Sequence, residues 1–186
     1  MKNILLIFAF CTAFRVCSAL NDELCVVVPE STYTNQEFWV SVNLSNASRV
    51  YIEASVIVNY DAERLEYVAS EAGNFFTDIT SNTVIDTPQD SKVVFDVWGT
   101  QTVTGNGTLY KLKFKVKSCF GLVVPAYFSI QPHDIGTSGY YIGDNGLSVL
   151  YPFLNNCGQT SVTIYPVNPS SYPEVGKSGE CAIDVS

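Results

Sequence analysis

Strict alternation of apolar and polar side chains constrains the fold of this chain more than any other feature of its sequence. Between Arg49 and Val68 the residues RVYIEASVIVNYDAERLEYV alternate with a period of two, which is typical of a strand with one buried face. The apolar set is Ile52, Ala54, Val56, Val58 and Tyr60, and the opposite set is Tyr51, Glu53, Ser55, Ile57 and Asn59. We expect the first set to face a core and the second to face water or a partner.

The same alternation recurs along the chain in Glu37–Leu44, Lys92–Trp98 and Leu109–Lys117. Shorter candidate strands are Leu24–Val28, Thr83–Asp86, Leu122–Ile130, Leu147–Leu150 and Ser161–Tyr165, while Ser31–Gln36, Gly99–Gly107 and Gln131–Asn145 are predicted to be turns or loops. No stretch of the sequence has a convincing helical period. About nine short strands separated by turns predict an all-β sandwich.

The stretch Leu109–Lys117 carries a row of lysines on one side, Lys111, Lys113, Lys115 and Lys117. Such a row keeps one face of a strand hydrated and discourages pairing between sheets. An acidic ligand is the alternative use of the same row.

The two ends of the chain differ in composition from the part between them. Met1–Ala19 has a basic start, a short apolar run and the small-residue site Cys17-Ser18-Ala19, which together predict a secretory signal. Residues 20–166 are expected to form the sandwich domain, and the Pro- and Ser-rich residues 167–186 an extended tail. The apolar run is too short to span a bilayer. We therefore expect a secreted protein without a membrane-inserted segment.

The charge of the chain excludes two classes of partner. Two of its ten Lys and Arg residues, Lys2 and Arg15, lie in the signal, whereas all 18 Asp and Glu residues follow it, so the mature chain has a formal charge of −10. Nucleic acids and anionic membranes both attract basic surfaces. Neither is an expected partner, and the acidity is sufficiently explained by solubility.

Four cysteines remain after the signal, namely Cys25, Cys119, Cys157 and Cys181. An even number in an oxidising compartment predicts two disulfides, for which three pairings are open. No short Cys spacing suits zinc, and Asp134 and Asp144 lack the spacing of a calcium loop. His133 is the single histidine, and no Gly-x-Ser-x-Gly motif occurs. We expect neither catalytic residues nor a metal or other cofactor.

Three Asn-x-Ser/Thr sequons without proline begin at Asn43, Asn46 and Asn106. In a eukaryotic source we expect N-glycosylation at one or more of them. Asn106 is the preferred site because it lies in a Gly-rich stretch.

Several motifs together resemble those of cohesins, the jelly-roll modules that hold dockerin-bearing proteins. A strand ending in Tyr60-Asp61, with Leu65 beyond a tight turn, is similar to the corner after the third cohesin strand. Gly73 is similar to a glycine that the family often carries there. The segments TLYKLKFKVKS (108–118) and SVTIY (161–165) resemble the seventh and the last strand. The resemblance covers Leu24–Tyr165 and implies a nine-stranded jelly roll, which cellulose-binding modules share.

The resemblance also implies a binding face. In cohesins the outward faces corresponding to Tyr51–Asn59 and Val94–Trp98 belong to one exposed sheet. The implied partner-binding residues are Glu53, Ser55, Ile57, Asn59, Asp96 and Trp98. Type I cohesins carry an Asn and an Asp where this chain has Glu53 and Ser55, so the implied partner is dockerin-like or another extracellular protein.

Two alternatives to this face remain open. A loop or the C-terminal tail would bury the apolar groups of the face in a second small core. A carbohydrate-binding module would instead use the aromatic rings of Tyr140 and Tyr141, or of Trp39, to stack on a polysaccharide.

The strand directions of the cohesin jelly roll further imply a disulfide pairing. Cys25 and Cys157 would lie at one end of the sandwich, and Cys119 and Cys181 at the other. Disulfides require Cα atoms about 4.4 to 6.8 Å apart. The resemblance therefore implies the pairs Cys25–Cys157 and Cys119–Cys181.

Overall fold

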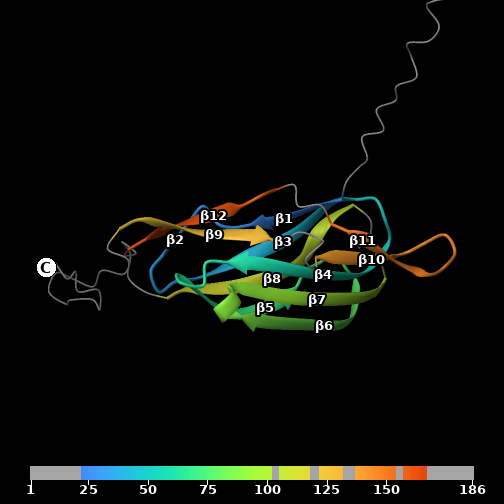
Figure 1. Ribbon diagram of the computed structural model, residues 1–186, viewed down its shortest axis with the longest axis horizontal. Coiled ribbons are helices and arrows are strands. Elements are labelled where there is room, and N and C mark those ends of the chain that lie inside the picture. Colours follow the sequence, from blue (N-terminus) through green and yellow to red (C-terminus); the bar gives the residue numbers. More distant parts are fainter. Residues whose placement is uncertain (1–21, 102–104, 118–121, 132–136, 154–156, 167–186) are drawn as a thin grey trace, which may run out of the picture.

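The computed structural model (Figure 1) describes residues 22–101, 105–117, 122–131, 137–153 and 157–166. The expected signal (1–19) and tail (167–186) lie outside the described residues. The strands are β1 (Glu23–Val27), β2 (Ser31–Tyr33), β3 (Glu37–Ala47), β4 (Tyr51–Tyr60), β5 (Leu65–Ala72), β6 (Asp78–Thr87), β7 (Lys92–Gln101), β8 (Gly105–Val116), β9 (Val124–Ile130), β10 (Ser138–Ile142), β11 (Ser148–Pro152) and β12 (Thr160–Tyr165). One 3₁₀ turn, η1 (Pro88–Asp90), joins β6 to β7.

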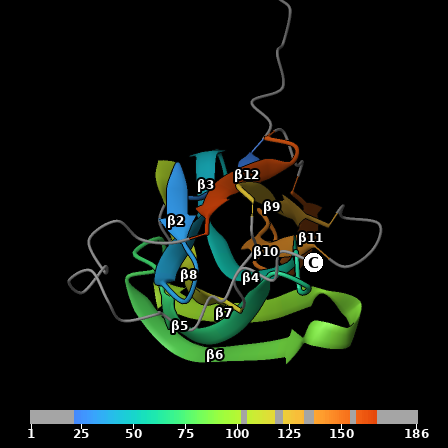
Figure 2. The same ribbon diagram turned by 90° about the vertical axis from the view of Figure 1, so that its left-hand side faces the viewer.

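Two sheets form the predicted all-β sandwich. The first has the strand order β1-β3-β8-β5, and the second the order β11-β10-β4-β9-β12-β2. Besides β10 and β9, β4 also pairs with β7, and β7 in turn pairs with β6. The strand β6 forms the outer edge of the molecule in Figures 1 and 2. The strand β12 runs parallel to β2, whereas β4 pairs antiparallel with β7, β9 and β10.

The described chain contains twelve strands rather than the nine predicted. Ser31–Gln36, predicted to be a turn, contributes β2, which pairs with β12. The predicted loop Gln131–Asn145 contains β10, and the predicted loop Gly99–Gly107 is largely taken up by the ends of β7 and β8. In the last two segments glycines suggested loops, although several of these glycines make room for side chains. A Cβ on Gly139 would lie 2.5 Å from Cζ of Phe153.

The core lies between the two sheets and is built from the inward side chains of the alternating strands. From β4 it receives Ala54, Val56, Val58 and Tyr60, as predicted. Phe95 of β7 stacks on Tyr110 of β8 across the sandwich, with ring centroids 4.7 Å apart. Such buried aromatic pairs contribute about 0.5 to 1.5 kcal/mol beyond the area that they remove from water.

A disulfide joins Cys25 of β1 to Cys157, whose Cα atoms lie 5.2 Å apart. This is the first of the two pairs that the resemblance implied. Cys119 and Cys181 lie outside the described residues. Among the described residues, no helix is long and apolar enough to cross a membrane.

Candidate binding face

A β-bulge at the start of β4 sets which side chains face outward. Tyr141 of β10 pairs with Tyr51, whereas its neighbour Tyr140 pairs with Glu53, so Ile52 is an extra residue in β4. Tyr51 is fully buried as a result, with its ring centroid 5.2 Å from that of Phe153. The predictions that Tyr51 faces outward and Ile52 faces the core are therefore wrong. The extra residue shifts the alternation by one position, so that Tyr51 points into the core and Ile52 points outward.

A buried carboxylate holds this bulge in place. Asp22 is 1% exposed and accepts hydrogen bonds from the backbone N–H and the hydroxyl of Ser48, both at 3.0 Å. The hydroxyl of Tyr51 donates to the second oxygen of the same carboxylate. The carboxylate thereby ties the chain on both sides of the β3–β4 turn.

Beyond the bulge, the six residues predicted to bind a partner lie together on the outward face of β4 and β7. The strand register places Glu53 beside Trp98 and Ser55 beside Asp96, while Ile57 and Asn59 lie further along β4 beside Val94 and Lys92. Trp98 is 43% exposed, so no loop of the described chain buries it. The C-terminal tail, the other covering segment considered above, lies outside the described residues.

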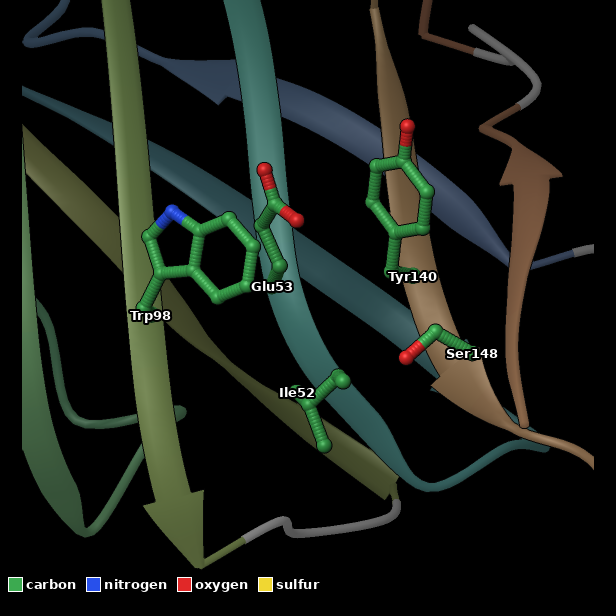
Figure 3. Close-up of a pocket in the computed structure, with 5 residues that line it drawn as sticks. All are labelled: Ile52, Glu53, Trp98, Tyr140 and Ser148. Atoms are coloured by element: carbon green, nitrogen blue, oxygen red, sulfur yellow. The ribbon is translucent and has the colours of Figure 1, made fainter. Parts of the chain in front are cut away.

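A pocket of about 310 Å³ opens on this face where the β10–β11 hairpin adjoins β4 through β10. Its lining residues are Ile52, Glu53, Trp98, Tyr140 and Ser148. Figure 3 shows the Glu53 carboxylate between the indole of Trp98 and the ring of Tyr140. Adjacent strands lie about 4.8 Å apart, so the backbones of β7 and β10, which flank β4, are about 10 Å apart.

The Glu53 carboxylate is the unusual electrostatic feature of the pocket. The residue is only 8% exposed, and within the described chain its carboxylate has no hydrogen-bond or ion-pair partner. Burial, and secondarily the charge of Asp96, raise the pKa of Glu53 to about 7. A buried, unpaired carboxylate beside another carboxylate costs folding free energy when it is ionised.

We therefore expect Glu53→Gln to stabilise the fold at pH 8. The folded pKa lies above the ordinary value of 4.5, so the stability of the unmodified protein falls as pH rises from about 4.5 to about 7. Removing the charge should raise the free energy of unfolding on the order of 1 kcal/mol, or the Tm by roughly 2 to 4 °C. Thermal unfolding at pH 8 and pH 5 measures this. A gain as large at pH 5 as at pH 8 would contradict the assignment.

The β10–β11 hairpin that supplies Tyr140 is held to the sandwich by Arg49. The Arg49 guanidinium lies between the rings of Tyr141 and Tyr151, 4.6 and 4.3 Å from their centroids. Tyr140 and Tyr141 thus have different surroundings, since Tyr140 lines the pocket.

Sequence reasoning missed Ile52, Tyr140 and Ser148 as members of this face. The available signal for a further strand was the run Tyr140-Tyr141-Ile142, whose aromatic and β-branched side chains favour strands.

The lysine row and Trp39 lie on the other sheet. Lys111 and Lys113 form ion pairs of 2.7 and 2.6 Å with Glu71 and Glu37, and Lys113 Nζ lies 5.5 Å from the ring centroid of Trp39. These carboxylates neutralise part of the row, which weakens the case for an acidic ligand there. Trp39 and Tyr140, considered above for glycans, lie in different sheets and do not form one aromatic platform.

The predicted glycosylation sites lie on the first sheet, away from the candidate binding face. The sequons converge where β3 meets β8: Asn43 accepts a hydrogen bond from Thr108, and Asn106 accepts one from the backbone N–H of Asn46. Asn46 and Asn106 are exposed, and glycosylation stays a prediction. No group of three or more metal-ligating side chains occurs within the described residues. His133 and Asp134 lie outside them.

The cohesin domain model matches residues 25–122, more than half of the chain. The chain belongs to the cohesin family. Solved cohesin structures share its jelly-roll fold at low sequence identity. The seventh ScaB type I cohesin from Pseudobacteroides cellulosolvens has a TM-score of 0.63 and 17% identity, over 82% of this chain and 97% of the other.

Two further structures show how widely this cohesin fold occurs. The Coh-OlpA-Doc918 type I cohesin–dockerin complex from Clostridium thermocellum matches with a TM-score of 0.62 and 10% identity, over 78% of this chain and 99% of the other. A non-cellulosomal cohesin from the archaeon Archaeoglobus fulgidus matches with a TM-score of 0.57 and 17% identity, over 77% and 91%. Among curated proteins, no sequence matches the chain.

Proposed function

We propose that this cohesin is a secreted, non-catalytic module that binds a dockerin-like or other extracellular protein through the outward face of β4 and β7. The observation that carries the proposal is the exposed indole of Trp98, set among polar groups on an otherwise regular sheet. Membership of the cohesin family supports protein binding, since a cohesin of the same fold is known in complex with a dockerin.

The chemistry of the face suits protein recognition. Trp98 and Ile57 provide apolar area, and Ile85 of the edge strand β6, 53% exposed, extends it beyond Val94. Polar side chains surround this area: Ser55, Asn59, Thr83 and Asp96. Aromatic anchors within a polar rim are typical of the energetic centres of protein interfaces.

Secretion is supported by the sequence of Met1–Ala19 and by the Cys25–Cys157 disulfide, because disulfides persist in oxidising compartments. The excess of acidic residues argues against a nucleic-acid partner. A polysaccharide remains the alternative ligand.

Trp98→Ala is expected to weaken partner binding by about 2 kcal/mol or more, roughly 30-fold, because truncating a central anchor removes its packing in the complex. The measurement is capture of partners from the secretome by the immobilised protein, followed by titration of the captured protein. Trp39→Ala is the matched control, since Trp39 is 41% exposed on the other sheet.

Equal losses from both tryptophan variants, or unchanged binding by a folded Trp98→Ala variant, would contradict the proposed face. A parallel panel of polysaccharides tests the alternative. Retention of one of them, with no captured protein, would favour the carbohydrate-binding module.

A further inference from the structure

We propose that the pocket between Trp98, Glu53 and Tyr140 takes one basic side chain, a lysine or an arginine, of the protein partner. The inference rests on the proposed protein-binding function and specifies the chemistry of the partner at one point of the face.

The walls of the pocket suit a cation. Trp98 and Tyr140 flank Glu53 on neighbouring strands, so their rings lie on the two sides of the same carboxylate (Figure 3). A cation is attracted to the face of an aromatic ring within about 6 Å of its centroid. Figure 3 shows both rings nearly face-on, so their faces are turned to the open side of the pocket, where a cationic side chain would lie over the Glu53 carboxylate.

The floor of the pocket supplies charge without a counter-ion. Glu53 and Asp96 approach each other closely enough for the charge of Asp96 to raise the pKa of Glu53. In the described chain neither carboxylate has an ion-pair partner, and Lys92 lies four residues from Asp96 along β7. The other side chains that line the pocket, those of Ile52, Trp98, Tyr140 and Ser148, carry no basic group. A cation such as a basic side chain would therefore offset the repulsion between the two carboxylates.

The size and position of the pocket favour a side chain of a larger partner. Its 310 Å³ is at the lower end of the range of about 300 to 1,000 Å³ found for ligand pockets, and this is enough room for one extended side chain. The pocket opens on the same face as Ser55, Ile57 and Asn59. A protein lying across that face would bring a side chain directly over Glu53.

This arrangement makes binding dependent on pH. A cation binds the ionised form of Glu53, and the fraction of a group of pKa about 7 that is ionised falls about tenfold between pH 8 and pH 6. The affinity for a basic side chain should fall by up to the same factor as the pH is lowered. Glu53→Gln should remove this dependence.

The test uses N-acetyl-arginine methylamide as the probe and its citrulline analogue as an uncharged control of the same shape. Both are titrated into the full chain at pH 8, with the indole N–H of Trp98 followed by NMR. We expect saturable shifts with the arginine compound, at least tenfold weaker binding in Glu53→Gln, and unchanged binding in Trp39→Ala. Equal binding of the citrulline compound, or no effect of Glu53→Gln, would overturn the proposal.

Two further results separate this inference from the proposed function. If Trp98→Ala abolishes capture of a secreted protein while Glu53→Gln and pH leave it unchanged, the binding face stands and the cation pocket is wrong. If cellobiose shifts the Trp98 signal and the arginine compound does not, the pocket belongs to a carbohydrate site.

Discussion

Replacing Cys25 and Cys157 together by serine is expected to lower the free energy of unfolding by about 3 to 5 kcal/mol. The bond joins residues separated by 132 positions, so it closes most of the described chain into one loop. On the chain-entropy account, removing such a crosslink gives the unfolded chain a large gain in freedom. Denaturant unfolding of the double variant beside the intact protein measures the difference.

The location of this disulfide gives the test a second readout. Cys25 belongs to β1, the edge strand of the first sheet, where it lies opposite Asn43 of β3. Cys157 precedes β12 of the second sheet. The bond therefore ties the two sheets together at one end of the sandwich. Peptide mapping of the unreduced protein should recover the Cys25–Cys157 link. Recovery of a Cys119–Cys157 link, or a double variant of undiminished stability, would contradict this account.

Alternation predicted most of the outward side chains of β4, while the resemblance to cohesins predicted that they lie beside those of β7. From Glu53 to Asn59 the side chains that point outward from β4 are those that the period-two pattern predicts. The inward residues that alternate with them, Ala54, Val56 and Val58, are small or branched and apolar. The pattern failed at Tyr51 and Ile52, where both side chains are apolar and either suits a core. A one-residue bulge exchanges the two faces of a strand, and nothing in two adjacent apolar residues reveals it.

The pocket could not be predicted because its walls come from distant parts of the chain. Glu53 alternates like any outward residue, and its burial depends on Tyr140 of β10, which pairs beside it. Gly139 precedes that tyrosine and suggested a loop, although its missing side chain gives room to the rings of Tyr51 and Phe153. Close packing of aromatic rings against glycine is a tertiary feature, so local sequence patterns do not distinguish it from a turn.

The unpaired Glu53 carboxylate supports the proposal that this face binds a partner. A side chain that lowers stability when ionised is commonly retained where binding requires it. Its cost in the free chain would be offset in a complex that supplies a cation, so Glu53→Gln should improve stability and weaken binding. Those opposite effects distinguish a binding residue from a merely tolerated one.

Gly73→Ala is expected to destabilise the fold by about 3 kcal/mol or more, or to lower the Tm by roughly 6 to 12 °C. Gly73 lies where the chain leaves β5 of the first sheet for β6 at the edge of the binding face. A Cβ at this position would lie 1.9 Å from the backbone oxygen of Thr108. Since real Cβ atoms do not approach an oxygen so closely, one of the two backbone segments has to move.

Neither segment can move without losing hydrogen bonds. The N–H of Gly73 donates to the backbone oxygen of Leu109, and that of Phe75 donates to the oxygen of Thr108, both at 2.9 Å. Gly146→Ala is the matched control, because that glycine has open space around it and a φ of +75°, so its substitution costs only about 1 to 2 kcal/mol of backbone strain. Thermal and denaturant unfolding of both variants decide the matter. A Gly73→Ala variant as stable as Gly146→Ala would show that β5 and β8 approach each other less closely than described, and that the path into β6 differs.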